Sequence, residues 1–288
     1  MWLAPVEGVF RDLREGNPFD PPTDFARELE PGVTLRSLTE SDERLIDDWF
    51  QFFERYVAEP EVESARAADL VLRSDMEPDG FPEKVTAFVL SLSLHTRTAL
   101  TARALHFDLD DAGEVDRRLG HAPESTFRLR NWQEAQPMLR VELGAVAETY
   151  PHLARIRRSP HLGQARSLGA YRAAVSRAGF VDAVPILACA SLEALAATAR
   201  SSKVIHRLVP RYVSEDSATQ TLESFYRLRH WFAHGATIPE MRDAEVRLRL
   251  LDEGLAVVKE ILLRAYSDHD LLKASESGVK AVRTYLDG

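Results

Sequence analysis

The sequence contains a single cysteine, Cys189, among its 288 residues. One cysteine cannot form an internal disulfide, which excludes a small disulfide-stapled secreted scaffold and favours a reducing, cytoplasmic setting. The chain also lacks any run of about 20 apolar residues, so we expect no membrane-spanning helix and no membrane partner. It opens without a basic segment ahead of an apolar core, and we therefore expect no signal peptide. No glycine-rich phosphate loop and no zinc-binding spacing of cysteines occur.

The composition is typical of a globular protein, with 45% hydrophobic and 28% charged residues. A chain of this length buries one large core or two modest ones. The net charge of −9 is unevenly distributed: residues 1–150 carry −14, whereas residues 151–235 carry +7, with 12 Lys and Arg against 5 Asp and Glu. A local basic surface suits a phosphate backbone such as that of RNA. The alternative is that the acidic N-terminal region packs on the basic one.

Hydrophobic periodicity predicts a mainly α-helical fold, with a helical bundle in the second half of the chain. We expect a mostly helical, acidic region of unknown role over residues 1–150 and the bundle over residues 151–288. The first region is either a second small domain or an extension on the same core. Because no Gly/Ser linker separates the two, one continuous body is favoured. Predicted helices of the second half cover 132–149, 162–179, 181–200, 203–212, 216–234, 240–267 and 269–286.

The N-terminal half is less regular. Its first 38 residues are rich in proline, glycine and acids, which predicts loop structure, with a clear turn at Asn17–Pro22. Further on, we expect a helix from Thr39 or Ser41 to Pro60 and two more over 63–73 and 82–95. The pattern over 101–109 favours a strand, and residues 110–130 a surface loop with a short strand.

The most informative segment is Leu228–Gly235, at the end of the predicted helix 216–234. It carries Arg229 and His234 five residues apart, which places them about 140° apart around a helix. Gly235 suits the left-handed position that ends a helix. The imidazole at the helix end is therefore free to turn toward the arginine side or toward a second chain. Upstream, the apolar helix from Asp182 carries one carboxylate, Glu193, in its middle.

Arg229, His234, Gly235 and the upstream Glu193 helix together resemble the Apea-like group of the HEPN superfamily. The resemblance covers about residues 150–265. It implies an up-and-down helical bundle and a metal-independent endoribonuclease without a cofactor. It further implies a homodimer in which two Arg–His pairs face each other. The resemblance places such a protein in prokaryotic stress or antiviral defence, as a toxin-like RNA-cleaving effector.

The chemistry of Arg229 and His234 suits this expectation. RNA carries its own nucleophile, the 2′-hydroxyl, so cleavage needs a proton-transfer group and a fixed cation. An imidazole titrates near neutral pH, and a guanidinium matches phosphate oxygens. We therefore predict proton transfer by His234 and phosphate stabilisation by Arg229. The supporting residues that we predict are Glu193 (orienting the arginine), His230 (positioning or binding phosphate), and Arg227 and Tyr226 (contacting RNA).

Several alternatives stay open. The chain could be a non-catalytic HEPN module that binds RNA or a protein partner and mediates dimerisation, with Arg229 closing a buried pair to Glu193. His230 and His234, four residues apart, could chelate a metal on one helical face. Asp108–Asp111 could bind a cation, although a solvated loop is favoured. Toxins that pair with a nucleotidyltransferase antitoxin carry a tyrosine two residues after the histidine; Ala236 departs from that pattern. A regulatory protein or a nucleic-acid activator would then control the activity.

Overall fold

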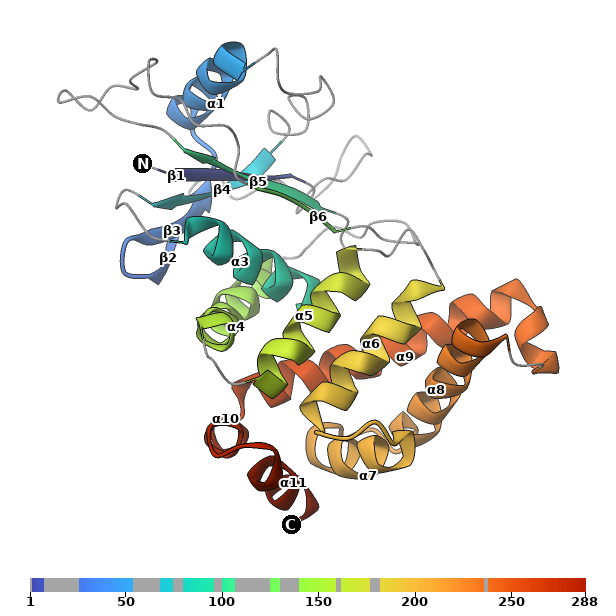
Figure 1. Cartoon of the computed structure of the whole chain (residues 1–288). Helices are drawn as coiled ribbons and strands as arrows, with labels where there is room; N and C mark the ends of the chain where they lie inside the picture. The colour runs from blue at the N-terminus through green and yellow to red at the C-terminus, as the bar shows by residue number, and fades with distance from the viewer. Residues whose placement is uncertain are drawn as a thin grey trace. The chain divides into compact units, whose positions relative to one another are not determined.

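The computed structural model divides into two compact units, Met1–Ala154 and Arg155–Gly288. It describes residues 2–7, 26–53, 68–74, 80–95, 100–106, 125–129, 140–158, 162–176, 182–235 and 238–288. The fold is mainly helical with a few short strands, as the sequence predicts (Figure 1). The division falls inside helix α4 (Arg140–Arg158), so the chain passes between the units without a Gly/Ser linker.

The first unit is built on one six-stranded antiparallel sheet in the order β2-β3-β4-β1-β5-β6. Its strands are β1 (Trp2–Glu7), β2 (Ala26–Glu30), β3 (Val33–Ser37), β4 (Ala68–Ser74), β5 (Leu100–His106) and β6 (Ser125–Leu129). In the inner strand β4, Leu70, Val71 and Leu72 are all fully buried. Consecutive buried residues point to opposite faces of a strand, so both faces of the sheet are covered here.

Helices α1 (Glu40–Phe53) and α3 (Phe81–His95) lie on opposite sides of this sheet in Figure 1. Most of α3 is buried, from Phe81 through Leu94. Two of its polar side chains have partners on α4: Ser91 donates to the carbonyl of Val146 at 2.7 Å, and the His95 ring lies 2.7 Å from the Thr149 hydroxyl. These hydrogen bonds offset the burial of polar side chains in a helix that is buried over most of its length.

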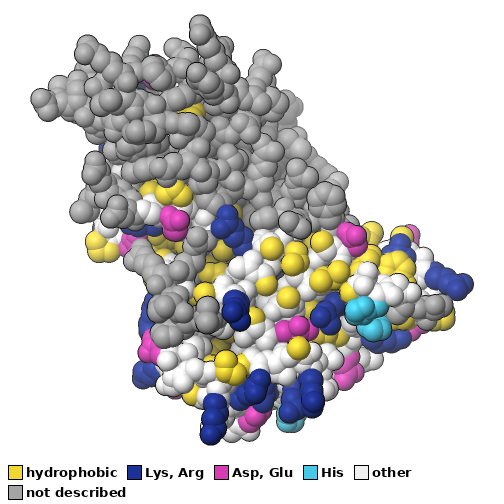
Figure 2. All heavy atoms as spheres, viewed as in Figure 1, with side chains coloured by type: hydrophobic (Ala, Val, Ile, Leu, Met, Phe, Trp, Pro, Cys, Tyr) yellow, Lys and Arg dark blue, Asp and Glu magenta, His cyan; other side chains and the backbone are white. Residues whose placement is uncertain are grey.

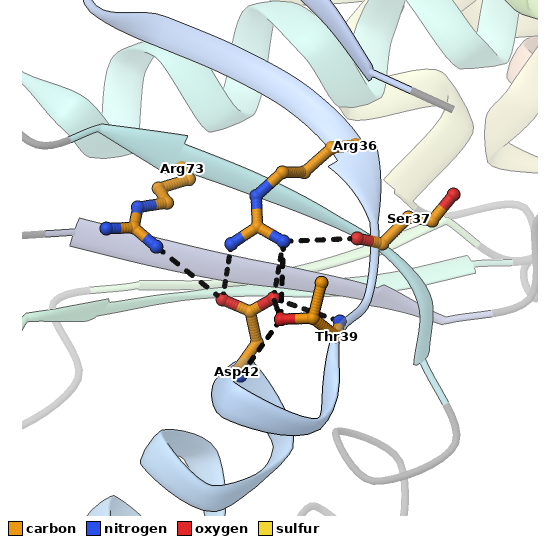
Figure 3. A network of polar contacts seen from close by, with 5 residues as sticks. All are labelled: Arg36, Ser37, Thr39, Asp42 and Arg73. Carbon is orange, nitrogen blue, oxygen red and sulfur yellow. Dashed lines mark hydrogen bonds and ion pairs between the residues drawn. The ribbon is translucent and has the colours of Figure 1, made fainter. Parts of the chain in front are cut away.

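A buried carboxylate fixes the start of α1 to the sheet (Figure 3). Asp42 accepts two hydrogen bonds of 2.6 Å from the Arg36 guanidinium of β3, and Arg73 of β4 lies 4.0 Å away. The Asp42 side chain also accepts from the backbone N–H of Thr39 at 3.0 Å, while the Thr39 hydroxyl accepts from the backbone N–H of Asp42 at 3.4 Å. This reciprocal pattern is a capping box. The network is structural because its charges satisfy one another.

The second unit is a helical bundle of α5, α6, α8 and α9, with α7, α10 and α11 packed at its end. Its elements are α5 (Leu162–Ser176), α6 (Ala183–Leu195), α7 (Ser201–Tyr212), α8 (Ala218–His234), the 3-10 helix η1 (Pro239–Arg242), α9 (Ala244–Ser267), α10 (His269–Glu276) and α11 (Val279–Asp287). Buried hydroxyls join three of them: Ser167 of α5 lies 3.1 Å from Ser191 of α6 and 2.9 Å from Tyr266 of α9. None of the described helices is long and apolar enough to cross a membrane.

Four predictions about secondary structure were wrong. The first 38 residues form β1, β2 and β3 rather than loop alone, and the predicted helix 63–73 is strand β4 from Ala68 onward. Helix α4 continues through Pro151, where we expected it to end, because Leu153 and Ile156 beyond the proline are fully buried. The last predicted helix is two helices, α10 and α11, separated at Gly278, whose φ of +100° a side chain rarely adopts.

Other predictions are confirmed. Helix α3 matches the predicted helix 82–95, β5 the strand predicted over 101–109, and β6 the short strand predicted within 110–130. The Asn17–Pro22 turn, the helix end at Pro60, the predicted helical residues 132–139 and the Asp108–Asp111 cluster lie outside the described residues.

Candidate active site at the end of helix α8

Helix α8 ends as its sequence predicts. Leu222, Phe225 and Leu228 are fully buried at helical spacing, so one face of α8 packs inward. Gly235 follows in the left-handed conformation, with φ 63° and ψ 31°, and its N–H donates to the Trp231 carbonyl at 3.0 Å. The glycine lacks the Cβ that this conformation disfavours, and it stops the helix directly after His234.

Arg229 points toward α6 and meets Glu193. One guanidinium nitrogen, Nη2, lies 3.3 Å from Glu193 Oε1, and the two side chains are 30% and 15% exposed. Neither Arg229 Nε nor Glu193 Oε1, both buried, has a hydrogen-bond partner in the described part of the chain. Burial raises the pKa of Glu193, and the nearby Arg229 only partly opposes this. The structure therefore brings the predicted pair together, in a loose contact.

Two buried side chains lie near this pair, and the sequence analysis did not predict the burial of either next to it. Tyr226, one turn before Arg229, is 6% exposed, and its hydroxyl has no partner among the described residues. The Arg229 guanidinium carbon lies 6.0 Å from the Tyr226 ring centre. Cys189, one turn before Glu193, is fully buried. Because Tyr226 is buried, the predicted RNA contact through its side chain does not fit the structure. Its spacing of three from Arg229 places the two side chains on neighbouring turns of one face, which is the signal that could have indicated their shared environment.

Burial also sets the acidity of these two groups. It raises the pKa of the Cys189 thiol and of the Tyr226 hydroxyl far above their ordinary values, with the Arg229 charge acting in the opposite direction. Both groups stay neutral at physiological pH. Cys189 is therefore a small apolar neighbour of the site and no nucleophile.

Hydrogen bonds from two other helices fix the end of α6, the helix that carries Glu193. Ala197 adopts a left-handed φ of 51°, and its carbonyl accepts a hydrogen bond from Arg283 of α11 at 2.9 Å. The carbonyl of Ala196 accepts from Arg207 of α7 at 3.0 Å. Two arginines thus cap carbonyl groups that the end of a helix leaves open.

His230 and His234 lie on successive turns of α8, and both are exposed. Their ring centres are 4.8 Å apart, with an angle of 57° between the ring planes. Within the described residues neither imidazole makes a hydrogen bond, and no hydrogen bond or ion pair joins Arg229 to His234. The separation of about 140° expected for positions five apart accounts for this. One chain therefore presents the arginine and the histidines on different sides of α8.

The surroundings of α8 mix charged and apolar groups, and Figure 2 shows histidine, basic and hydrophobic side chains exposed together on one face of the second unit. Arg227 is exposed and forms an ion pair with the exposed Glu240 of η1. Arg247 of α9 lies 4.9 Å from the Trp231 ring centre and donates to the carbonyl of Met241 at 2.6 Å.

No group of three or more His, Cys, Asp or Glu side chains gathers around a metal position within the ranges that the structure describes.

Comparisons of the chain with protein-family models, with curated proteins and with solved structures give no match.

Proposed function

We propose that this chain is a metal-independent endoribonuclease of the HEPN type. The observation that carries the proposal is the state of Arg229 at the end of α8. Its side chain is 30% exposed, and its ion pair with Glu193, the one found among the described residues, is 3.3 Å long. An arginine that is partly exposed and held in one loose ion pair can still donate to a phosphate group. The exposed His230 and His234 follow within five residues and supply imidazole groups for proton transfer.

The proposed reaction uses the RNA's own 2′-hydroxyl. Its oxygen attacks the adjacent phosphorus, the new P–O2′ bond forms, and the P–O5′ bond breaks. The products are a 2′,3′-cyclic phosphate and a 5′-hydroxyl end. A neutral imidazole at His234 takes the proton of the 2′-hydroxyl, and a protonated imidazole returns one to the departing 5′-oxygen. Arg229 stabilises the negative charge on the non-bridging phosphate oxygens. No cofactor takes part in these steps.

The proposed active form is a homodimer. Arg229 and His234 diverge around α8, so a single chain does not direct both at one phosphate. A second copy placed against the end of α8 would bring its His234 to the Arg229 of the first. The same end offers apolar surface for association: Leu248 at the start of α9 is 42% exposed, and Trp231 and Phe232 are partly exposed.

The supporting residues take roles that fit their places. Glu193 holds Arg229 from the side opposite to solvent and orients it. His230 binds or positions the phosphate beside His234. Arg227 contacts RNA, because its ion pair with the exposed Glu240 is a surface pair of little net value that a phosphate can replace. The charge of +7 over residues 151–235 attracts the RNA backbone.

The proposed setting is a cytoplasmic effector of prokaryotic stress or antiviral defence. Such an enzyme needs restraint in healthy cells. A regulatory protein or a nucleic-acid activator would control the activity.

A second candidate function is a non-catalytic module that binds RNA or a protein partner. The observation in its favour is that Arg229 already contacts a carboxylate of its own chain, whereas both histidines lie on another side of the helix. In this interpretation the Arg229–Glu193 pair joins α6 to α8.

The experiment that separates the two is incubation of tag-free protein with total RNA in excess EDTA. We expect the wild type to produce cyclic phosphate ends and the His234→Ala variant to produce none. His206→Ala is the matched control, because His206 is an exposed histidine on α7, another helix of the same unit, and this variant should cleave like the wild type. Equal cleavage by the wild type and His234→Ala would contradict the enzyme. RNA binding without cleavage, at concentrations where the protein is dimeric, would establish the module.

A further inference from the structure

The pair His230 and His234 has a geometry that the proposed cleavage does not by itself explain. The two imidazoles lie on one face of α8, four residues apart, and both are exposed. Apart from their contact with each other, neither ring has a partner in the part of the chain that the structure describes. Histidine side chains usually find a hydrogen bond when a fold uses them structurally. Their ring nitrogens are therefore accessible to a ligand from solvent.

The spacing of the rings matches that of two imidazoles on one metal ion. A metal–nitrogen bond is about 2.1 Å long, and a ring nitrogen lies about 1.2 Å from its ring centre. For nitrogen–metal–nitrogen angles between about 90° and 109°, two bound imidazoles then have their centres roughly 4.6 to 5.4 Å apart. The observed separation of 4.8 Å lies in this interval. Only small rotations of the exposed rings are needed to direct one nitrogen from each at a common point.

The electrostatic surroundings admit a cation in spite of the nearby arginines. Arg229 lies against Glu193, and Arg227 forms an ion pair with Glu240, so both charges are opposed locally. The histidines occupy the last turns of α8, where the helix dipole places partial negative charge. Both effects favour a positive ion over this face of the helix end.

We propose that His230 and His234 together bind one divalent transition-metal ion of the zinc, nickel and copper class. The ion takes one nitrogen from each ring and fills its remaining positions with water. Imidazole is a preferred ligand of these metals, and the affinity order places copper highest. Because the described chain supplies two ligands and no third, the site is open and exchanges its metal with the solution.

The consequence for activity rests on the proposed function. An imidazole whose nitrogen is bound to a metal cannot take up the proton of the 2′-hydroxyl. Zinc would therefore inhibit RNA cleavage, and EDTA would restore it. The metal site and the proton-transfer site share His234, so occupancy of one excludes use of the other.

The binding test uses the full, tag-free chain and zinc ions alone in a calorimetric titration. We expect one ion per chain, with affinity reduced roughly 10- to 100-fold in His230→Asn and in His234→Asn, because each change reduces a chelate to a single ligand. The double variant, which keeps neither imidazole, should bind zinc more weakly than either single variant. His206→Asn, which removes an exposed histidine from α7, should bind like the wild type. A second readout is the electron paramagnetic resonance spectrum of bound copper, in which two imidazole nitrogens should couple to the metal.

Unchanged zinc affinity in both His230→Asn and His234→Asn would overturn the site, as would equal losses in His206→Asn. The fate of the proposed function is measured separately, as cleavage of RNA in EDTA. If the histidine pair binds zinc but the protein does not cleave RNA, the metal site is supported and the proposed ribonuclease is contradicted. If the protein cleaves RNA without inhibition by zinc and the pair binds no zinc, the ribonuclease is supported and the metal site is contradicted.

Discussion

Two junctions of the helical bundle each contain an arginine facing a carboxylate, and they differ in how completely the arginine is satisfied. At the α7–α11 junction, Arg207 donates to both carboxylate oxygens of Asp287, at 2.5 and 2.7 Å, and to the Ala196 carbonyl at 3.0 Å. Its side chain is 6% exposed. At the α6–α8 junction, Arg229 makes one contact of 3.3 Å with Glu193, and its Nε has no partner among the described residues.

This difference indicates that Arg207 has a structural role, whereas Arg229 is able to bind a ligand. A buried donor without a partner costs about 1–3 kcal/mol, so folds normally satisfy such groups, as this one does at Arg207. A fold that leaves donors unused at a half-exposed arginine loses stability at that point. Places where local rules are broken are expected at functional sites. By this criterion the α6–α8 junction is the candidate site, and the α7–α11 junction supports it by capping the end of α6.

The substitution Arg229→Ala should have the largest effect on activity. We expect RNA cleavage in EDTA to fall about 100- to 1,000-fold, because the variant removes the cation that stabilises phosphate charge. The melting temperature should change little, since the ion pair of Arg229 with Glu193 is long, at 3.3 Å. Arg229→Lys should also lose most activity, because an ammonium group lacks the planar fork.

The matched control for this variant is Arg264→Ala. Arg264 is exposed on α9 and pairs with Glu260 four residues earlier, away from the α6–α8 junction. It should cleave like the wild type. If Arg229→Ala instead unfolds the protein and Arg229→Lys restores both fold and cleavage, the arginine is a structural charge and the contrast with Arg207 fails.

The next largest effect is expected at the other junction. Arg207→Ala removes the donor of the buried Ala196 carbonyl and the bond that ties α7 to the end of α11. We expect the free energy of unfolding to fall by about 2 kcal/mol, measured by urea denaturation. Cleavage by the folded fraction should be close to normal. A loss of cleavage equal to that of Arg229→Ala, with stability unchanged, would reverse the assignment of the two arginines.

The helices of the bundle could be predicted from the sequence because the signals that fix them are local. The end of α8 follows from the spacing of Leu222, Phe225 and Leu228 and from Gly235, all within 14 residues. The sheet was missed because its neighbours are distant along the chain: β1 pairs with β4, about 65 residues away. The short apolar run at Leu70–Leu72 suits a buried strand or a buried helix equally, and only the pairing decides between them.

The candidate site could likewise be predicted only in part from the sequence. The pairing of Arg229 with Glu193 was one of the arrangements that the sequence suggested, since each is a charged residue in an otherwise apolar helix. The burial of Tyr226 was not predicted, because it depends on which face of α8 meets α6. A helix with buried residues at 222, 225 and 228 can turn position 226 either inward or outward.

The smallest expected effect tests whether the Arg229–Glu193 contact stabilises the fold. Burial raises the pKa of Glu193, so between the ordinary pKa of a glutamate and the raised one the folded state binds more protons than the unfolded state. Stability therefore falls as pH rises through that window, and Glu193→Gln should lack this component. We expect the variant to differ from the wild type by less than about 1 kcal/mol at neutral pH, because the side chain keeps its shape.

The control is Glu223→Gln, which removes an exposed carboxylate from α8 and should leave the pH dependence of unfolding unchanged. Arg229 only partly opposes the effect of burial on Glu193, so Glu193→Gln should gain stability relative to the wild type as pH rises through the raised pKa of Glu193. A loss of several kcal/mol at neutral pH would instead mean that the pair is a buried ion pair on which the bundle depends. Arg229 would then be a structural residue like Arg207, and its state would no longer support phosphate binding.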